Sequence, residues 1–272
     1  MSSTDSLSLS NKVVIITGSG KENGIGAAIA LTLAGSGARV TLTTSLTPLR
    51  HSAVGKGRAI AVKADVSTAE GSKKIVEETL SGFGVDYINI IGRRNTLALL
   101  NRRCIPVFSF KNKLLTSRLL SELKAEDIMK TFQVAVVGPV LLLQAAYPHI
   151  PRGGRIVNIG SVASKLGFVQ MPIYAAAKAA MDQLTFTLAR EIGRDGKNIT
   201  VNTVAPGPVL TDSLPPVPEV EPVKDYLISL TRAEERVGTV EDIADAVLLL
   251  TSEKSRWITG QFISVSGGIN GG

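Results

Sequence analysis

Cysteine and histidine are scarce in this 272-residue sequence, which contains only Cys104, His51 and His149. A single cysteine excludes both an internal disulfide and a metal cluster built on cysteines. The two histidines lie far apart in the chain, which argues against a zinc site or a histidine-based catalytic triad. The chemistry must therefore come from other residue types.

Long apolar runs are also missing. The first ten residues have neither a basic start nor an extended apolar core, so we expect no secretion signal. The longest apolar runs, such as 139–143, are far shorter than a membrane span. We therefore expect a soluble, cytoplasmic protein without a membrane partner.

Excess charge is confined to one segment. The net charge is +7, and residues 90–113 contain six basic residues and no acidic one. The rest of the chain is nearly neutral, so no basic face spreads over the fold as nucleic-acid binding usually requires. We expect no nucleic-acid partner. The six residues are Arg93, Arg94, Arg102, Arg103, Lys111 and Lys113.

Apolar and β-branched runs alternate with helical patterns along the chain. This alternation predicts an α/β fold: a single doubly wound, Rossmann-like parallel sheet with helices on both faces, forming one domain over residues 1–272. With 44% hydrophobic residues the chain can bury a large core. Strands are expected at 12–17, 38–43, 59–62, from 85, at 155–159, 198–204 and 261–265, and long helices at 27–34, 124–148, 174–193 and 240–251.

A glycine-rich loop lies between the first strand and the first helix. Gly18, Gly24, Ile25 and Gly26 occupy this turn, which is the context that a dinucleotide-binding fingerprint requires. The glycines let the backbone approach a pyrophosphate, which would rest on the N–H groups at the start of the helix.

The second strand ends in Thr44 and Ser45 instead of an acidic residue. An acid here would bind the adenosine ribose hydroxyls and repel a 2′-phosphate. Its absence, together with Lys21 and Arg50, favours NADP over NAD as the cofactor.

Tyr174 and Lys178 are four residues apart, so on a helix they project from one face. A lysine ammonium one turn away stabilises a phenolate and lowers the pKa of the tyrosine, which suits proton transfer near neutral pH. Ser161 follows a predicted strand and is positioned to hydrogen-bond the oxygen that the tyrosine protonates. The alternative is a tyrosine on the surface of an amphipathic helix. The glycine loop, Thr44, Asp65, Ser161 and Gly207 all follow strand ends, which argues for one shared site.

These motifs together resemble the short-chain dehydrogenase/reductase family over about residues 11–268. The match is nearest to ketoreductase-type members, such as 3-oxoacyl reductases and reductases of polyketide pathways. It implies that Tyr174 is the general acid or base, that Lys178 lowers its pKa, and that Ser161 polarises the substrate oxygen. It also implies that Tyr174 and Lys178 contact the cofactor, with Lys178 at the nicotinamide ribose. It further implies adenine contacts from Asp65 and Val66, and contacts to the carboxamide and phosphate end from Gly207, Val209 and Thr211.

Three features depart from the family pattern. The glycine loop is two residues longer than usual, and Ala135 stands where the family has an asparagine that holds a water beside the lysine. Residues 89–112 replace the usual Asn-Asn-Ala-Gly with an atypical basic insertion. Two interpretations of this segment remain: a true insertion near the site, or a translated segment, such as a retained intron, that does not belong.

We expect an NADP-dependent oxidoreductase that reduces a ketone, or oxidises the alcohol, of an apolar small molecule in secondary metabolism. The alternative is a cofactor-binding protein with little catalysis, because Ala135 and the missing motif remove two usual supports. Five prolines at or after position 208 suggest that residues 208–237 cover the substrate. The helices at 127–148 and 172–192 favour a homo-oligomer.

Overall fold

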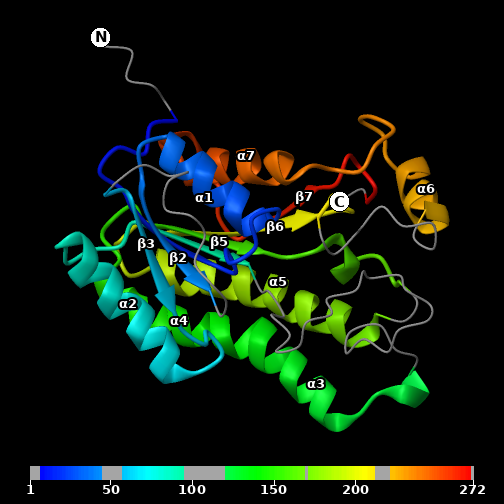
Figure 1. The fold of residues 1–272 in the computed structure, drawn as a ribbon, viewed down its shortest axis with the longest axis horizontal. Coiled ribbons are helices and arrows are strands. Elements are labelled where there is room, and N and C mark those ends of the chain that lie inside the picture. Colours follow the sequence, from blue (N-terminus) through cyan, green and yellow to red (C-terminus); the bar gives the residue numbers. More distant parts are fainter. Residues whose placement is uncertain (1–6, 45–56, 95–119, 169–170, 212–220, 271–272) are drawn as a thin grey trace.

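Seven strands form one parallel sheet in the computed structural model, which describes residues 7–44, 57–94, 120–168, 171–211 and 221–270 (Figure 1). The strand order is β3-β2-β1-β4-β5-β6-β7, so the chain starts near the middle and winds outward in both directions. This arrangement confirms the predicted doubly wound α/β fold. The strands are β1 Val13–Thr17, β2 Arg39–Thr44, β3 Ala59–Lys63, β4 Ile90–Arg94, β5 Arg155–Ile159, β6 Thr200–Pro206 and β7 Phe262–Val265.

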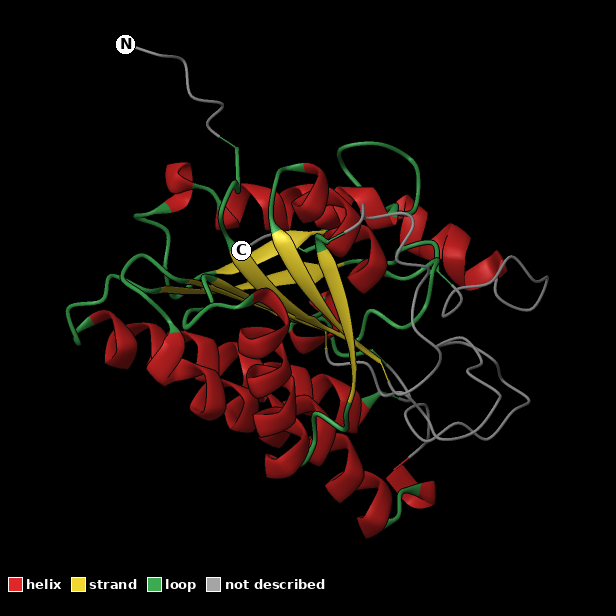
Figure 2. Cartoon of the chain, turned by 60° about the vertical axis from the view of Figure 1, so that its left-hand side comes forward, coloured by secondary structure: helices red, strands yellow, loops and turns green. Residues whose placement is uncertain are grey.

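Helices cover both faces of the sheet (Figure 2). Helices α1 and α7 pack together on one face, whereas α2, α4 and α5 lie on the other (Figure 1). The helices are α1 Ile25–Gly35, α2 Ala69–Phe83, α3 Ala125–Phe132, α4 Gly138–Ala146, α5 Pro172–Gly193, α6 Glu221–Ser229 and α7 Val240–Thr251. Short 3₁₀ turns are η2 Leu120–Glu122, η4 Tyr147–His149, η5 Val162–Ser164 and η6 Glu253–Ser255, and η3 Gln133–Val137 is a π-helix.

Alternation along the strands divides the apolar core into two layers. Val14 and Ile16 of β1 pack toward α1 and α7, whereas Val13 and Ile15 pack toward the opposite helices. Each of these four side chains is at most 1% exposed. Successive residues of a strand point to opposite faces, so a strand buried on both sides reads as a continuous apolar run. The run at the start of the chain was predicted as a strand for this reason.

The fourth strand lies further along the chain than the sequence predicted. We expected it to begin at Val85 and regular structure to stop at Asn89, but β4 spans Ile90–Arg94. Asn89 lies before the strand and bonds to the start of β1, where its side-chain oxygen accepts a hydrogen bond from Val13 N at 2.9 Å. The first residues of the supposed insertion therefore belong to the centre of the sheet, and residues 95–112 lie outside the described part.

The helix Ala125–His149 is continuous through its π-helical and 3₁₀ turns, and it is long and apolar enough to cross a membrane. Length and composition alone cannot separate such a span from the core helix of a soluble protein. Here Leu142, Leu143 and Ala146 are buried against the sheet in the same core layer as α2. A third of the most apolar 18-residue window of this helix is buried in this way.

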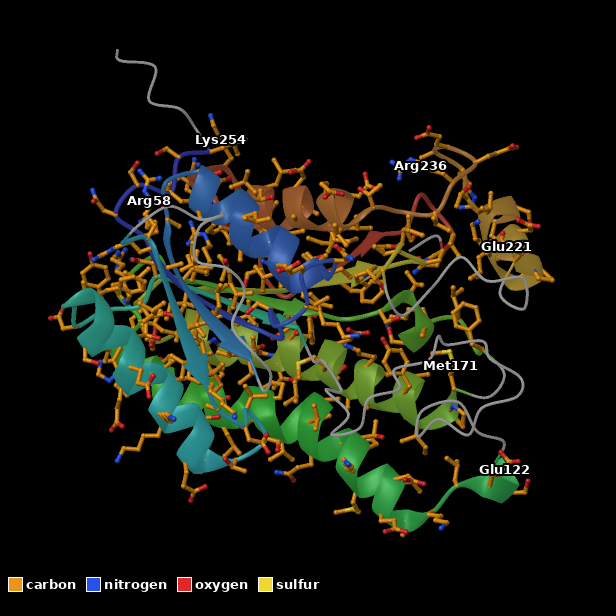
Figure 3. The ribbon with its side chains drawn as sticks, viewed as in Figure 1. Arg58, Glu122, Met171, Glu221, Arg236 and Lys254 are labelled. Carbon is orange, nitrogen blue, oxygen red and sulfur yellow. The ribbon has the colours of Figure 1, made fainter. Side chains whose placement is uncertain are left out.

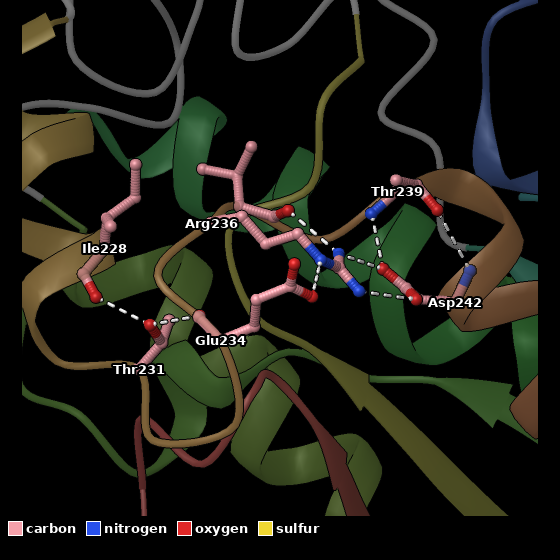
Figure 4. A network of polar contacts seen from close by, with 7 residues as sticks. Ile228, Thr231, Glu234, Arg236, Thr239 and Asp242 are labelled. Atoms are coloured by element: carbon pink, nitrogen blue, oxygen red, sulfur yellow. Dashed lines mark hydrogen bonds and ion pairs between the residues drawn. The ribbon is translucent and has the colours of Figure 1, made fainter.

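A capping box starts α7 and ties down the segment before it (Figure 4). Thr239 Oγ1 accepts a hydrogen bond from Asp242 N, and Asp242 accepts one in return from Thr239 N at 2.7 Å. The Asp242 carboxylate also receives two hydrogen bonds from Arg236, at 2.6 and 3.1 Å. Arg236 first, and the backbone of Thr239 second, hold the pKa of Asp242 below its usual range, although burial opposes them.

Thr239→Ala should lower the free energy of unfolding by about 1 kcal/mol, because the first turn of α7 loses its cap. Urea unfolding measures this value. The matched control is Thr187→Ala, which changes an exposed threonine within α5. Because the folded-state pKa of Asp242 is depressed, its contribution to stability is present above the unfolded pKa and is lost as the pH falls through the folded value. The stabilities of wild type and Asp242→Asn should therefore converge in acid. Equal losses in Thr239→Ala and Thr187→Ala would contradict the capping role.

Candidate active site

The carboxyl ends of the parallel strands place the predicted site residues along one edge of the sheet. Gly18 follows β1, Asp65 lies two residues after β3, Ser161 lies two after β5, and Gly207 follows β6. Figure 3 shows the two ends of the sheet: Arg58, just before β3, lies on the opposite side of the molecule from Met171, just before α5. This edge is where doubly wound sheets bind their ligands.

The glycine loop has a backbone suited to a pyrophosphate. Gly18 has φ +69°, a conformation that residues with side chains rarely adopt. A β-carbon on Gly26 would lie 2.6 Å from the Gly18 carbonyl oxygen, so only glycine fits there. Gly24 is the N-cap of α1 and provides no side-chain cap to the first turn, so the N–H groups at this helix end suit an anionic ligand. The residues present therefore fit the diphosphate of a dinucleotide.

Ser19 anchors the lengthened loop, a role that the sequence did not reveal. Its hydroxyl lies 3.2 Å from Ile16 O and 3.3 Å from Thr43 O, and the side chain is fully buried. The loop is thereby tied to both β1 and β2. The two additional residues of the loop leave Gly18 and Gly26 in close contact.

Asp65 is exposed at the end of β3, where one carboxylate oxygen accepts hydrogen bonds from Ser67 N at 2.9 Å and Ser67 Oγ at 2.7 Å. These bonds fix the orientation of the carboxylate. Gln133 donates a 2.6 Å hydrogen bond to Ser67 O and so links this turn to the π-helix. Thr44 pairs with Lys63 at the end of β2, and Ser45 lies outside the described residues.

Lys178 is buried beneath the carboxyl end of β5. Its side chain is 3% exposed, and Nζ donates a 2.8 Å hydrogen bond to Ile159 O. The same nitrogen lies 5.6 Å from the centre of the Tyr174 ring, one turn earlier on α5. Pro172 at the start of this helix is compatible with its first turn, where no intrahelical N–H bond is needed. The expected pairing of the two side chains on one helix face is thus present.

Ser161 is the N-cap of η5, and its Oγ accepts a hydrogen bond from Ala163 N at 3.1 Å. A hydroxyl that accepts this bond keeps its own hydrogen for donation to a ligand. The residue lies two positions after Ile159, whose carbonyl oxygen holds Lys178. The carboxyl end of β5 therefore positions both Ser161 and Lys178.

Two features that depart from the resembled family pattern lie near Lys178 and at the end of β4. Ala135 lies within the π-helix Gln133–Val137 and is 4% exposed. π-Helical turns inside α-helices are frequent at functional sites, and in this chain the turn carries an alanine. Arg93 and Arg94 occupy the end of β4, in register with Thr17 of β1 and Ile159 of β5. They directly follow Gly92, the last residue of the segment that stands in place of the Asn-Asn-Ala-Gly motif.

The end of β6 turns away through Gly207 and Val209. A β-carbon on Gly207 would lie 2.8 Å from Ser266 Cβ, and Val209 forms a parallel bridge with Gly238. Thr211 is the last residue described before the gap at 212–220. Residues 208–211 and 221–237 thus border this end of the sheet, and a covering role for 208–237 stays a prediction.

Sequence reasoning missed Asp182 and Ser164. Ser164 Oγ donates a 2.6 Å hydrogen bond to Asp182 Oδ2, directly beside the turn that carries Ser161. A signal for Asp182 was present, because it follows Lys178 by four residues and so continues the row begun by Tyr174.

The chain is similar to known oxidoreductases over nearly its full length. The sequence model of a family described as enoyl-(acyl carrier protein) reductase matches residues 18–270. The short-chain dehydrogenase/reductase FrzI of Cladobotryum is 35% identical, with 96% of this chain and 97% of that protein covered. Versicolorin reductase stcU of Emericella nidulans is 30% identical, with 98% and 99% covered.

A solved structure agrees with these sequence matches. A short-chain dehydrogenase from Burkholderia cenocepacia in complex with NADP superimposes with a TM-score of 0.78 at 31% identity, covering 97% of this chain and 99% of that one. The strand order, the glycine loop and the Tyr174–Lys178 pair all accord with this similarity. The chain belongs to the short-chain dehydrogenase/reductase family and is an oxidoreductase acting on CH–OH and C=O groups.

Proposed function

We propose that this protein reduces a ketone on an apolar small molecule with NADPH, or oxidises the corresponding alcohol with NADP. The observation that carries the proposal is the buried Lys178, fixed on Ile159 O with its ammonium 5.6 Å from the Tyr174 ring. A buried cation beside a phenol makes the phenolate less costly, which equips Tyr174 to give up and regain a proton.

The protein residues divide the work on the substrate oxygen. Ser161 donates a hydrogen bond to the carbonyl oxygen and so polarises the C=O group. Tyr174 donates its proton to the same oxygen as negative charge develops there, and Lys178 stabilises the resulting phenolate. In the oxidation direction the phenolate removes the proton from the alcohol.

The cofactor would be held along the carboxyl edge of the sheet. Gly18, Gly24, Ile25 and Gly26 would surround the pyrophosphate, with Asp65 and Val66 at the adenine, and Gly207, Val209 and Thr211 at the nicotinamide end. Lys178 would also hydrogen-bond the nicotinamide ribose. When bound, the nicotinamide supplies or accepts the hydride.

Several features support NADP over NAD. β2 ends in Thr44 and not in an acid, and its register partner Lys63 adds a cation at this edge. The similar Burkholderia protein was solved with NADP.

Thr44→Asp should shift the preference from NADPH toward NADH, because a carboxylate binds the ribose hydroxyls and repels the 2′-phosphate. The ratio of the two dissociation constants, measured by cofactor fluorescence, should change by at least about tenfold. The control is Asp86→Asn, which changes an exposed charge and should leave this ratio unchanged. Thr43→Asp is unsuitable as a control because Thr43 is buried. An unchanged ratio would contradict NADP selectivity at this strand end.

An apolar substrate accords with the surroundings of the site. Leu210 is 51% exposed and Tyr226 is 60% exposed on the two described parts of the covering segment. A similar protein is named versicolorin reductase, which supports a ketone of secondary metabolism as the substrate class. We further propose that the protein is a cytoplasmic homo-oligomer, as expected from the sequence. A thermal-shift screen with NADPH, followed by candidate ketones and identification of the alcohol, tests the substrate class; absence of any alcohol product would count against it.

Ala135 favours a second candidate, a cofactor-binding protein of this fold with little catalysis. The residue lies buried at the π-helix, where no asparagine side chain holds a water near Lys178. Ala135→Asn distinguishes the two candidates. A large rise in turnover would show that proton relay limits a working site, whereas binding of NADPH without turnover in both proteins would favour the second candidate.

A further inference from the structure

Asp182 sits one helical turn beyond Lys178 and contacts the turn that carries Ser161. Its Oδ2 accepts a 2.6 Å hydrogen bond from Ser164 Oγ. Ser164 Oγ also lies 2.9 Å from the backbone oxygen of Ser161. Ser164 thus links the helix carboxylate to the backbone of the predicted catalytic serine.

The second oxygen of Asp182 faces the same loop. The position of a β-carbon on Gly160 would lie 3.2 Å from Asp182 Oδ1, and the glycine therefore lets the carboxylate approach the backbone closely. Oδ1 is buried and has no hydrogen-bond partner within the described residues. The two oxygens therefore flank the segment Gly160–Ser164.

Two cations face this carboxylate. Lys165, just after η5, and Lys178, on the same helix, both favour its ionised form, as does the hydrogen bond from Ser164. Burial is the largest influence and raises the pKa of Asp182 above its usual value. Tyr174 lies beyond Lys178 on the same row of α5, so a charge at Asp182 acts on the tyrosine through the field around Lys178.

We propose that Asp182 is a positioning residue of the active site. Through Ser164 it holds the Ser161 turn against α5, and its negative charge offsets the ammonium of Lys178 beside Tyr174. This inference rests on the proposed function, because it assigns Ser161, Tyr174 and Lys178 their catalytic roles. Two substitutions separate its two parts: Asp182→Asn keeps an acceptor for Ser164 and loses the charge, whereas Ser164→Ala keeps the charge and loses the link.

The ultraviolet absorbance of tyrosinate tests the charge without any substrate. Each protein is titrated beside the same protein carrying Tyr174→Phe, and the difference reports Tyr174 alone. Tyr147 interferes little, because its hydrogen bond to Asp195 raises its pKa to about 12. Asp182→Asn should move the Tyr174 titration to lower pH, since removal of a nearby negative charge favours the phenolate. Ser164→Ala should leave the titration near that of wild type.

Asp86→Asn is the matched control, because it removes an exposed carboxylate before β4, at the far edge of the sheet. It should leave the titration unchanged. An unchanged titration in Asp182→Asn, with a normal melting temperature, would overturn the proposal even if the protein reduces ketones. Conversely, a shifted titration in a protein that reduces no ketone would sustain the charge effect and count against the proposed function.

Kinetics test the link to Ser161. With a ketone that the wild type reduces, Ser164→Ala should lower kcat by about tenfold with little change in NADPH affinity, because the turn is less well placed. Asp182→Asn should shift the pH profile of alcohol oxidation to lower pH in parallel with the tyrosinate titration. A kcat for Ser164→Ala equal to that of wild type would contradict the positioning role.

Discussion

Tyr174→Phe should lower kcat for ketone reduction by about 10²- to 10⁴-fold, because it removes the proton donor while preserving the aromatic ring. NADPH affinity should change little, since the glycine loop and Asp65 are untouched. Initial rates and cofactor fluorescence measure the two quantities on the same protein. A loss confined to kcat assigns the effect to the chemical step.

Tyr87→Phe is the matched control for this substitution. Tyr87 precedes β4 at the opposite edge of the sheet, so its loss should leave kcat unchanged. If Tyr174→Phe retained the turnover of wild type, the proton would come from another group and the proposed mechanism would be wrong.

Gly26→Ala should greatly weaken NADPH binding. A β-carbon at this position would lie 2.6 Å from Gly18 O and 3.1 Å from Ser19 Cα, both backbone atoms that cannot rotate away. Overpacking of this kind costs about 1–3 kcal/mol, so the melting temperature should also fall. The displaced loop no longer matches the pyrophosphate, and NADPH should therefore add less thermal stabilisation than it does to wild type.

Gly35→Ala provides the control on the same helix. Nothing lies within 4 Å of a β-carbon at Gly35, the last residue of α1. This change should stabilise the helix by about 0.5–1 kcal/mol and leave NADPH binding intact. Equal NADPH affinity in Gly26→Ala and wild type would contradict the cofactor site at the glycine loop.

Strong local patterns made most of the fold predictable. The apolar run before Gly18 and the small-residue helix after it predicted β1 and α1 because burial on both faces leaves no polar position. The helix through Tyr174 and Lys178 was predicted from their four-residue spacing and from the alanines around them, which favour a helix. Such elements carry their own boundaries in the sequence.

β4 was misplaced because its boundaries depend on tertiary contacts. Val85–Ile88 is apolar enough for a strand, but pairing with β1 begins only after Asn89 bonds to Val13. Arg93 and Arg94 lie within the strand although their charge suggested irregular structure. A pairing partner 76 residues away is not visible in a local pattern.

The candidate site was predictable where spacing carries the chemistry. Tyr174 and Lys178 follow from a four-residue interval, and the convergence of strand ends follows from parallel topology. Asp182 was missed because its hydrogen-bond partner Ser164 lies in a different element, 18 residues earlier in the chain. The burial of one Asp182 oxygen without a partner is visible only in three dimensions.

Ketone-dependent oxidation of NADPH by the purified protein tests the central claim most directly. Loss of NADPH absorbance is followed with a panel of apolar ketones and without ketone. We expect oxidation that requires a ketone, yields the corresponding alcohol in equal amount, and disappears in Tyr174→Phe. Tight NADPH binding without oxidation by any ketone of the panel would contradict the account.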